Sequence, residues 1–480
     1  MMRLGRKYQH LARPPGCACC IPVPEGIAFK LEDFSRRRFL AGAGAAAIAG
    51  IIASPAGAQS AVPKTLFRQV RVFDGKADTL TAAAQVLVEG NRITVVDTTN
   101  SDPPTDASVI DCGGRVLMPG LIDAHWHAIY AAVPLNVLMS GDPGIIFATS
   151  TAEAGRTLLR GFTTVRDVGG PTFSFRQAID IGIIEGPRIF PSGAMITTTS
   201  GHGDLRMPFE IPRDAGQLSL SERMGAAAIA DSIGDLKQRV REQLAQGASQ
   251  IKLVGSGGVS SPRAPLDVMT FGEADLRAAV EIASDWNTYV TVHAYTAQSV
   301  RRSIAAGVTC IEHAHLIDEE TARLMAEKKV WLSTQPFLTM ADTGSQTGSG
   351  AERAQQLFAG TPQLYGFVKR YGIRTAWGSD VLFSPALTDR QSLMLTHLAN
   401  WYSNAEALRM ATSQNAELLA LSGARAPYQG KLGVVEKGAL ADLLVVDGNP
   451  LEDIRLLEDP GRNLAVVMKD GRISKNALRT

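Results

Sequence analysis

The sequence is poor in cysteine and aromatic residues, and neither sign of charge is in excess. Only five of the 480 residues are cysteine, which argues against a scaffold held together by disulfides. Lys and Arg total 48 against 47 for Asp and Glu, so there is no basic field for nucleic acid and no acidic tail. After residue 60, no apolar run reaches the roughly 18 residues that a membrane span requires. We therefore expect a globular protein, long enough for a large core and a smaller second domain.

The first 58 residues are expected to be an export segment rather than part of the fold. Ser35–Leu40 reads SRRRFL and precedes a Gly/Ala-rich apolar run, after which Ala56–Ala58 offers a small-x-small cleavage site. This order resembles a twin-arginine signal, which predicts a periplasmic or secreted protein. A chance arginine cluster before an uncleaved apolar helix is the alternative. Cys17, Cys19 and Cys20 precede the signal, and the sequence suggests no role for them.

Two β-rich segments, residues 59–118 and 426–480, flank the rest of the chain. In the first, Gln85–Glu89 and Ile93–Val96 read as the strands of a hairpin, and in the second Ala441–Asp447 reads as a buried strand. We predict that the two segments pack together as one small β-sandwich domain. Cys112 lies in this predicted domain and Cys310 lies outside it, so no disulfide is expected between them.

Residues 119–425 alternate short β-branched runs with helical patterns such as Ser232–Gln246 and Glu273–Ser284. Eight strand-then-helix units over roughly 300 residues fit an α/β fold, a (β/α)₈ TIM barrel. A doubly wound open sheet is the alternative, but no glycine-rich nucleotide fingerprint follows the first strand. The predicted strands are Gly120–His127, Gly161–Asp167, Arg188–Ser192, Gln250–Val254, Tyr289–His293, Thr309–His313, Val330–Thr334 and Thr375–Asp380.

The segment Thr343–Gly350 is rich in Gly, Ser and Thr and follows the seventh predicted strand. This composition predicts a mobile loop. An ordinary surface loop and an active-site lid are both compatible with the sequence.

Residues with metal-binding side chains end several predicted strands, on the face where barrel enzymes place their sites. His125 and His127 are two apart on one strand, so both imidazoles face the barrel mouth. His293 and His313 end the fifth and sixth strands, and Asp380 ends the eighth. Each residue alone is compatible with a packed core histidine or a helix cap. Together they predict a site for zinc or a similar divalent ion, with Asp380 as both ligand and general base.

Lys252 is the least expected member of this group. It lies at the end of an apolar strand, where an ammonium facing two divalent cations would be strongly repelled. Carbamylation by CO₂ would convert its amine into a carboxylate that bridges two metals. A surface lysine just beyond the strand is the alternative.

This set of residues resembles the amidohydrolase superfamily in its binuclear, carboxylated-lysine form. That pattern has His-x-His on strand one, Lys on strand four, His on strands five and six, and Asp on strand eight. Met118–Asp123 and Lys437–Leu443 also resemble the family, so the likeness covers essentially all of the mature chain. The stretches around His202, Lys252 and His293 are similar to Xaa-Pro dipeptidase-like and ochratoxinase-like metal-dependent carboxypeptidases.

The resemblance implies two divalent metal ions, most often zinc, that share a hydroxide. The hydroxide would attack an amide carbonyl, and Asp380 would pass its proton to the leaving nitrogen. The implied ligands are His125, His127 and Asp380 for one ion, His293 and His313 for the other, and carboxylated Lys252 as the bridge.

Two further residues are predicted to bind substrate. His202 lies in a Gly-flanked loop after the third strand, and Tyr295 lies just beyond His293. Either is suited to a substrate carboxylate or the developing oxyanion. Loop packing for His202 and a buried core hydroxyl for Tyr295 are the alternatives.

The expected activity is release of a C-terminal amino acid from dipeptides, N-acyl amino acids or aryl amides such as ochratoxin A. A cyclic-amide hydrolase or a deaminase of the same superfamily is one alternative, although deaminases usually use one metal without the lysine. A binding protein that kept the fold and lost its metals is another, although the ligand set is complete here. The resemblance also implies a homo-oligomer.

Overall fold

The computed structural model describes residues 62–478, apart from residues 83, 99–101, 213–216, 262 and 345. The predicted export segment at residues 1–58, with Cys17, Cys19 and Cys20, lies outside the described residues. The first described strand is β1, Lys64–Val72.

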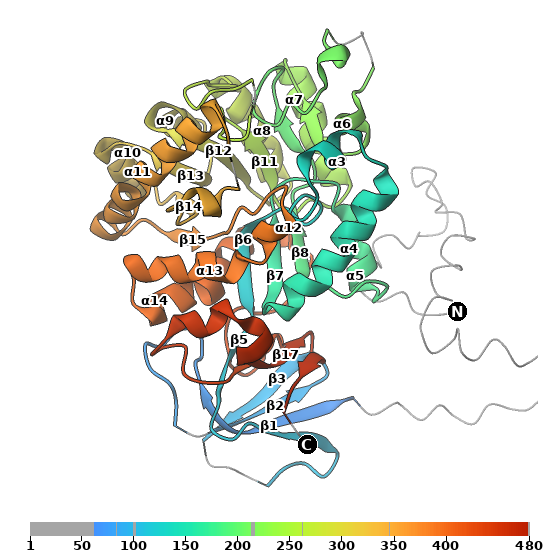
Figure 1. Cartoon of the computed structure of the whole chain (residues 1–480), viewed down its shortest axis with the longest axis vertical. Coiled ribbons are helices and arrows are strands. Elements are labelled where there is room, and N and C mark those ends of the chain that lie inside the picture. Colours follow the sequence, from blue (N-terminus) through green and yellow to red (C-terminus); the bar gives the residue numbers. More distant parts are fainter. Residues whose placement is uncertain are drawn as a thin grey trace, which may run out of the picture. The chain divides into compact units, whose positions relative to one another are not determined.

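The strands predicted for the middle of the chain are all present, with bounds that differ by a few residues (Figure 1). They are buried along nearly their whole length, which accounts for their apolar and β-branched composition. The strands are β6 (Leu121–Trp126), β7 (Phe162–Asp167), β8 (Arg188–Pro191), β11 (Ile251–Val254), β12 (Val290–Thr296), β13 (Cys310–Leu316), β14 (Trp331–Thr334) and β15 (Thr375–Trp377).

These strands form two parallel sheets. One is three-stranded, in the order β6-β7-β8, and the other is seven-stranded, in the order β10-β9-β11-β12-β13-β14-β15. The short strands β9 (Met195–Thr197) and β10 (Ala227–Ile229) were not predicted. His202, predicted to lie in the loop after the third strand, therefore lies after the additional strand β9. The backbone N–H of Asp380 donates to the carbonyl of His125 at 2.9 Å, which brings the ends of β15 and β6 together.

Helices follow most of the parallel strands. The predicted helix at Ser232–Gln246 is α7, Ile233–Ala245, and the one at Glu273–Ser284 is α8, Glu273–Asp285. Ser232 caps α7 by accepting from the N–H of Asp235. The other α-helices are α3 (Leu135–Ser140), α4 (Pro143–Leu159), α5 (Phe173–Asp180), α6 (Leu220–Arg223), α9 (Ala297–Ala305), α10 (Glu319–Glu327), α11 (Ser349–Tyr371), α12 (Pro385–Thr388), α13 (Gln391–Thr396), α14 (Asn404–Arg409), α15 (Asn415–Leu419) and α16 (Pro460–Asn463).

Both ends of the described chain meet in one eight-stranded sheet, here called the terminal sheet. Its order is β18-β17-β16-β5-β1-β2-β3, with β4 paired to β1, so the blue strands β1 to β3 and the red strand β17 of Figure 1 belong to one sheet. The link between the two ends is an antiparallel pair in which Met118 of β5 faces Leu444 of β16. The remaining bounds are β2 (Ala84–Glu89), β3 (Arg92–Asp97), β4 (Ala107–Asp111), β5 (Val116–Pro119), β16 (Leu443–Val446), β17 (Leu464–Lys469) and β18 (Arg472–Asn476).

A buried ion pair ties the parallel strands to the terminal sheet. Arg188, the first residue of β8, donates from Nε to Asp442 Oδ2 at 2.8 Å and from Nη2 to Asp470 Oδ1 at 2.6 Å. Although burial opposes it, the two carboxylates raise the pKa of Arg188. Removing one partner of such a pair typically costs about 3–5 kcal/mol, because the other charge stays buried.

Two further findings concern the cysteines and helices of the described part of the chain. Cys112 and Cys310 are both buried free thiols. Among the described helices, none combines the length and the apolar character needed to cross a bilayer.

Candidate active site

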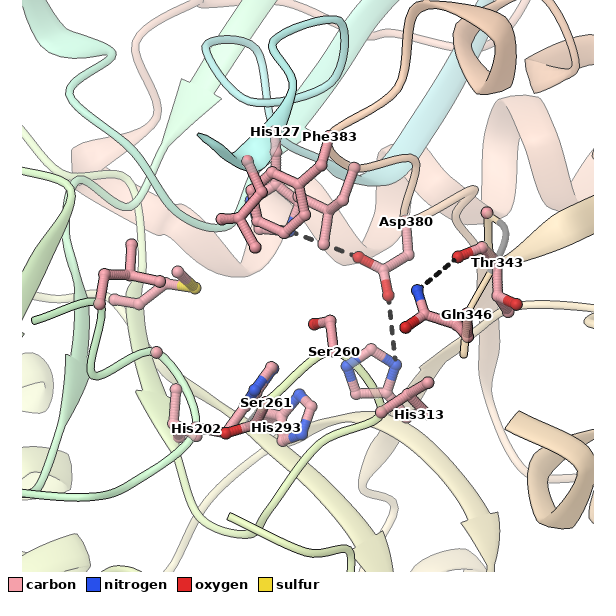
Figure 2. Close-up of a pocket in the computed structure, with 18 of the residues that line it drawn as sticks. His127, His202, Ser260, Ser261, His293, His313, Thr343, Gln346, Asp380 and Phe383 are labelled. Atoms are coloured by element: carbon pink, nitrogen blue, oxygen red, sulfur yellow. Dashed lines mark hydrogen bonds and ion pairs between the residues drawn. The ribbon is translucent and has the colours of Figure 1, made fainter. Parts of the chain in front are cut away.

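All eight residues predicted for the site line one cavity of about 490 Å³ at the carboxyl ends of the parallel strands. This convergence follows from topology, because parallel strands deliver their last residues to a common edge. The cavity is drawn in Figure 2, where Asp380 lies between His127 and His313. The eight residues are His125, His127, His202, Lys252, His293, Tyr295, His313 and Asp380.

The carboxylate of Asp380 is the centre of the arrangement. Its Oδ1 lies 3.2 Å from Nε2 of His125 and 3.4 Å from Nε2 of His127, and its Oδ2 lies 3.9 Å from Nδ1 of His313. Ligand atoms of His125, His313 and Asp380 all lie within 4.8 Å of one another. The family resemblance implied that His125 and Asp380 bind one ion and His313 the other. The close group therefore contains ligands of both implied ions.

The hydrogen bonds behind the first two imidazoles fix which nitrogen faces Asp380. His125 Nδ1 lies 2.7 Å from the carboxylate of Glu312, and His127 Nδ1 lies 3.0 Å from the carbonyl of Gly169. Both partners only accept, so each Nδ1 carries a proton. Both Nε2 atoms therefore face the Oδ1 of Asp380, and this carboxylate raises the pKa of His125, although burial opposes it. Either a proton or a metal ion can be shared between these atoms.

The other two histidines are held in a similar way. His293 donates from Nε2 to the carbonyl of Gly257 at 2.9 Å, which leaves Nδ1 as its lone-pair nitrogen. His313 Nδ1 lies 2.8 Å from the side-chain oxygen of Gln335. The rings of His293 and His313 are neighbours, with centroids 4.4 Å apart. Burial lowers the pKa of both imidazoles well below the usual value, so both are neutral, the form that binds a metal.

Asp380 stays ionised despite its burial. Burial raises its pKa, but the imidazoles of His125 and His127 outweigh that effect and hold it well below the usual range. The backbone φ of Asp380 is 51° and that of His313 is 76°, in the left-handed region that residues other than glycine rarely adopt. Strain at two neighbouring polar residues in one cavity is typical of a functional site.

Lys252 lies in β11, only 2% exposed, and lines the same cavity. Burial lowers the pKa of its amine, against the opposing influence of Glu312 and Asp380. The alternative of a surface lysine is therefore excluded by its position.

Asp123, in β6, was not recognised from the sequence as part of the site. It is fully buried and accepts from the backbone N–H groups of His125 and Ser379, both at 3.0 Å, and from Gln391 Nε2 at 2.9 Å. It thereby holds β6 and the segment after β15 in a fixed relation. Gly378 serves the same junction, because a Cβ there would lie 2.4 Å from the Cβ of His125.

Glu312 and Arg166 were also missed, although both lie inside predicted strands. Neither side chain is exposed, and Arg166 Nη2 donates to Glu312 Oε1 at 2.6 Å. Burial raises the pKa of Glu312, but Arg166 and His125 hold it well below the usual range. A buried, ionised Arg–Glu pair therefore lies directly behind His125.

The cavity is lined by residues of mixed character. Its lining includes the apolar side chains of Leu135, Met139 and Phe383 and the polar side chains of Ser260, Ser261 and Arg263. The guanidinium of Arg263 donates to the backbone carbonyls of residues 204 and 206 at 3.3 and 2.7 Å. These partners are neutral, so within the described residues the positive charge of Arg263 is available to a ligand.

The two predicted substrate residues lie beside the histidine cluster. The ring of His202 lies 4.6 Å from that of His293, and Tyr295 lies 4.7 Å from His313, between centroids. Burial lowers the pKa of His202 to about 4 and raises that of Tyr295. Among the described residues, Nδ1 of His202 is a buried atom without a hydrogen-bond partner.

The predicted loop at Thr343–Gly350 is shorter than expected, because α11 begins at Ser349. Thr343, Gly344 and Gln346 line the cavity. Just before them, Asp342 is buried and accepts from Arg390 Nη2 at 3.0 Å, which anchors the start of the segment. Its action as a lid remains a prediction.

Known proteins resemble this chain over most of its length. A model of the amidohydrolase family matches residues 116–474. Ochratoxinase of Aspergillus niger is 30% identical over 382 residues, which cover 75% of this chain and 76% of that protein.

Two solved structures are also similar to this chain. A prolidase complexed with N-methylphosphonate-L-proline has a TM-score of 0.78 and 34% identity, over 86% of this chain and 100% of that one. A Xaa-Pro dipeptidase with methionine bound in its active site has a TM-score of 0.73 and 28% identity, over 85% and 99%. Sequence, fold and the cluster of imidazoles around one carboxylate thus lead to the same conclusion: this chain belongs to the amidohydrolase family, whose members generally depend on metal ions.

Proposed function

We propose that this amide hydrolase releases the C-terminal amino acid from dipeptides or from N-acyl and aryl-acyl amino acids, with amides of the ochratoxin A type among its substrates. The observation that carries the proposal is the convergence of four histidines, Asp380 and Lys252 on one cavity. The names of the relatives, an ochratoxinase and two proline-type dipeptidases, support the choice of substrate class.

We further propose that the two parallel sheets close into a (β/α)₈ barrel and that the terminal sheet folds into a β-sandwich. The hydrogen bond from Asp380 to His125 supports closure, since it joins the last strand to the first. The domain limits proposed from the sequence, residues 119–425 for the barrel, are compatible with both sheets.

The donor set fits a pair of divalent ions. Neutral imidazoles and an ionised carboxylate are the ligands that zinc and similar ions prefer. His125, His127 and Asp380 would hold one ion, His293 and His313 would hold the other, and Lys252 in carboxylated form would supply a further oxygen ligand. Ions of this kind supply Lewis acidity and lower the pKa of water when they are bound.

Residues of the chain supply the proton transfer and keep the histidine ligands in the required tautomer. Asp380 accepts a proton from the attacking water at a carboxylate oxygen and delivers it to the leaving nitrogen. Glu312 and Gly169 keep the imidazoles of His125 and His127 in the tautomer that binds a metal.

Substrate recognition follows from the walls of the cavity. His202 and Tyr295 line the cavity, and we propose that they contact the oxygens of the scissile group or of the substrate carboxylate. We further propose that Arg263 binds the anionic end of the substrate and that the apolar lining residues, Leu135 and Phe383 among them, contact an apolar acyl group.

A hydrolysis screen tests the proposal. The purified protein, loaded with zinc, is offered N-acyl amino acids and dipeptides varied at the C-terminal position, with matched cyclic amides. We expect hydrolysis of the open-chain substrates and two equivalents of bound metal. Activity confined to cyclic amides would overturn the carboxypeptidase assignment.

A further inference from the structure

We propose that Glu312 and Arg166 form a positioning pair that orients His125 for metal binding. The inference rests on the proposed metal-dependent function, but it assigns a role to two residues that are not themselves expected ligands. Neither of them touches the cavity that holds the site.

Hydrogen bonds of Glu312 and Arg166 connect four strands. Glu312 lies in β13 and accepts from Nδ1 of His125 in β6 at 2.7 Å and from the hydroxyl of Thr291 in β12. Arg166 lies in β7 and donates from Nε to the carbonyl of Ala124 at 2.5 Å. Arg166 therefore holds the backbone just before His125, and Glu312 holds its ring.

The remaining donors of Arg166 are also engaged. Nη1 donates to the hydroxyl of Tyr289 at 3.1 Å and lies 3.7 Å from Sγ of Cys310, while Nη2 donates to Glu312. A guanidinium with this many fixed partners has one available orientation. The orientation of Glu312, and through it of the His125 ring, follows from it.

Stability alone does not explain such a pair. Burying an arginine and a glutamate completely costs desolvation that their attraction often fails to offset, and apolar replacements of similar volume are frequently as stable. Here the carboxylate has a second task, because only an acceptor behind Nδ1 keeps the proton there and leaves Nε2 free for a cation. The pair therefore serves the site rather than the core alone.

The test compares this pair with a second buried pair that has no contact with the site. The substitutions Glu312→Gln and Arg166→Met remove the charge of one partner each, and Arg188→Met and Asp442→Asn do the same for the pair at the start of β8. All four variants are expected to unfold at lower temperature. Zinc affinity of each folded variant is then measured by competition with a chelator.

We expect Glu312→Gln and Arg166→Met to weaken zinc binding by roughly 10- to 100-fold. The Arg188→Met and Asp442→Asn variants should bind zinc as the unmodified protein does. The double variant Arg166→Met/Glu312→Gln should lose less than the product of the single losses, since the two residues act as a unit. Unchanged affinity in Glu312→Gln, or equal losses in the control pair, would overturn the proposal.

A measurement without metal or substrate separates this inference from the proposed function. Nitrogen-15 NMR of labelled histidines in the metal-free protein reports whether Nδ1 or Nε2 of His125 carries the proton. A single Nδ1–H tautomer that becomes mixed in Glu312→Leu, which has no acceptor behind Nδ1, supports the positioning role, even if no amide substrate is hydrolysed. A mixed tautomer in the unmodified protein contradicts it, even if the enzyme is an active carboxypeptidase.

Discussion

The parallel strands are buried along nearly their whole length, whereas the terminal sheet combines buried strands such as β16 with the edge strand β18, in which no residue is buried. The buried strands of the two regions also differ in where their polar residues lie. Strand β16 reads LLVV and is apolar throughout, whereas β12 reads VTVHAYT and β13 reads CIEHAHL, with polar residues inside a buried run. Burying a polar group costs free energy unless it is paired. The parallel strands carry this cost near their carboxyl ends, where the site lies. We therefore expect substitutions there to act on activity and substitutions in the terminal sheet to act on stability.

The largest loss of activity is expected for the substitution Asp380→Asn. Loss of the carboxylate removes both a proposed ligand and the proton acceptor, so kcat/KM should fall about 10⁴-fold. That decrease corresponds to about 5.5 kcal/mol of lost transition-state stabilisation. Steady-state kinetics measures it, and the unfolding temperature serves as the control. Activity of the Asp380→Asn variant within tenfold of the unmodified enzyme contradicts the assigned role.

The opposite behaviour is expected of Phe67→Ala in the terminal sheet. Phe67 lies in β1, is fully buried and packs in the apolar core of that sheet. The cavity left by the missing ring should lower the free energy of unfolding by about 3–5 kcal/mol. Urea denaturation measures the decrease, while kcat/KM per folded molecule should stay unchanged. A parallel loss of activity would show that the two regions are coupled.

A smaller and more selective effect is expected at Arg263. Replacing it with Met should reduce kcat/KM about 10- to 150-fold for an N-acyl amino acid, since a hydrogen bond to a charged group contributes about 1.5–3 kcal/mol. The corresponding C-terminal carboxamide should be affected little, because it has no carboxylate to bind. Equal losses on both substrates would mean that Arg263 only supports the loop on which it lies.

The smallest effect is expected at a polar group on the outer surface. The hydroxyl and N–H of Thr321, with Arg301, lower the pKa of Asp318 to about 2, from a usual value of 3.8. The ionised carboxylate therefore stabilises the fold above about pH 4, and this contribution disappears as the pH falls through about 2. Asp318→Asn should cost less than about 1 kcal/mol at pH 7, because the group is exposed.

Denaturation of both proteins between pH 7 and pH 3 measures the difference in their free energies of unfolding. The difference should shrink toward the acidic end. A difference that stays constant with pH would indicate that the charge of Asp318 contributes nothing.

The sequence predicted the strands, and it indicated the candidate ligands, because their signals are local. His125 and His127 are two apart on an apolar strand, and Ser232 precedes a helical pattern, so each is readable within a short window. The family resemblance added Lys252, which no local pattern would have placed among histidines. The structure confirms that these residues share one cavity, whereas their binding of metal remains a proposal.

The residues and strands that were missed in the sequence depend mainly on contacts between distant segments of the chain. Asp123, Arg166 and Glu312 each lie inside a buried strand, and their importance appears only when a partner from another strand lies opposite. Strands β9 and β10 span three residues each, too few for a periodic pattern. Arg263 was not recognised because the cavity that it lines is assembled from distant segments of the chain.

The pairing of Met118 with Leu444 has a consequence for biosynthesis. A ribosome adds about 5–20 residues per second, so β5 waits for many seconds before its partner β16 is made. During that interval β5 lacks its partner and presents an open edge, a template for pairing with other nascent chains. A transcript truncated before β16 would make this exposure permanent, and we expect its product to be recovered in inclusion bodies rather than in the soluble fraction.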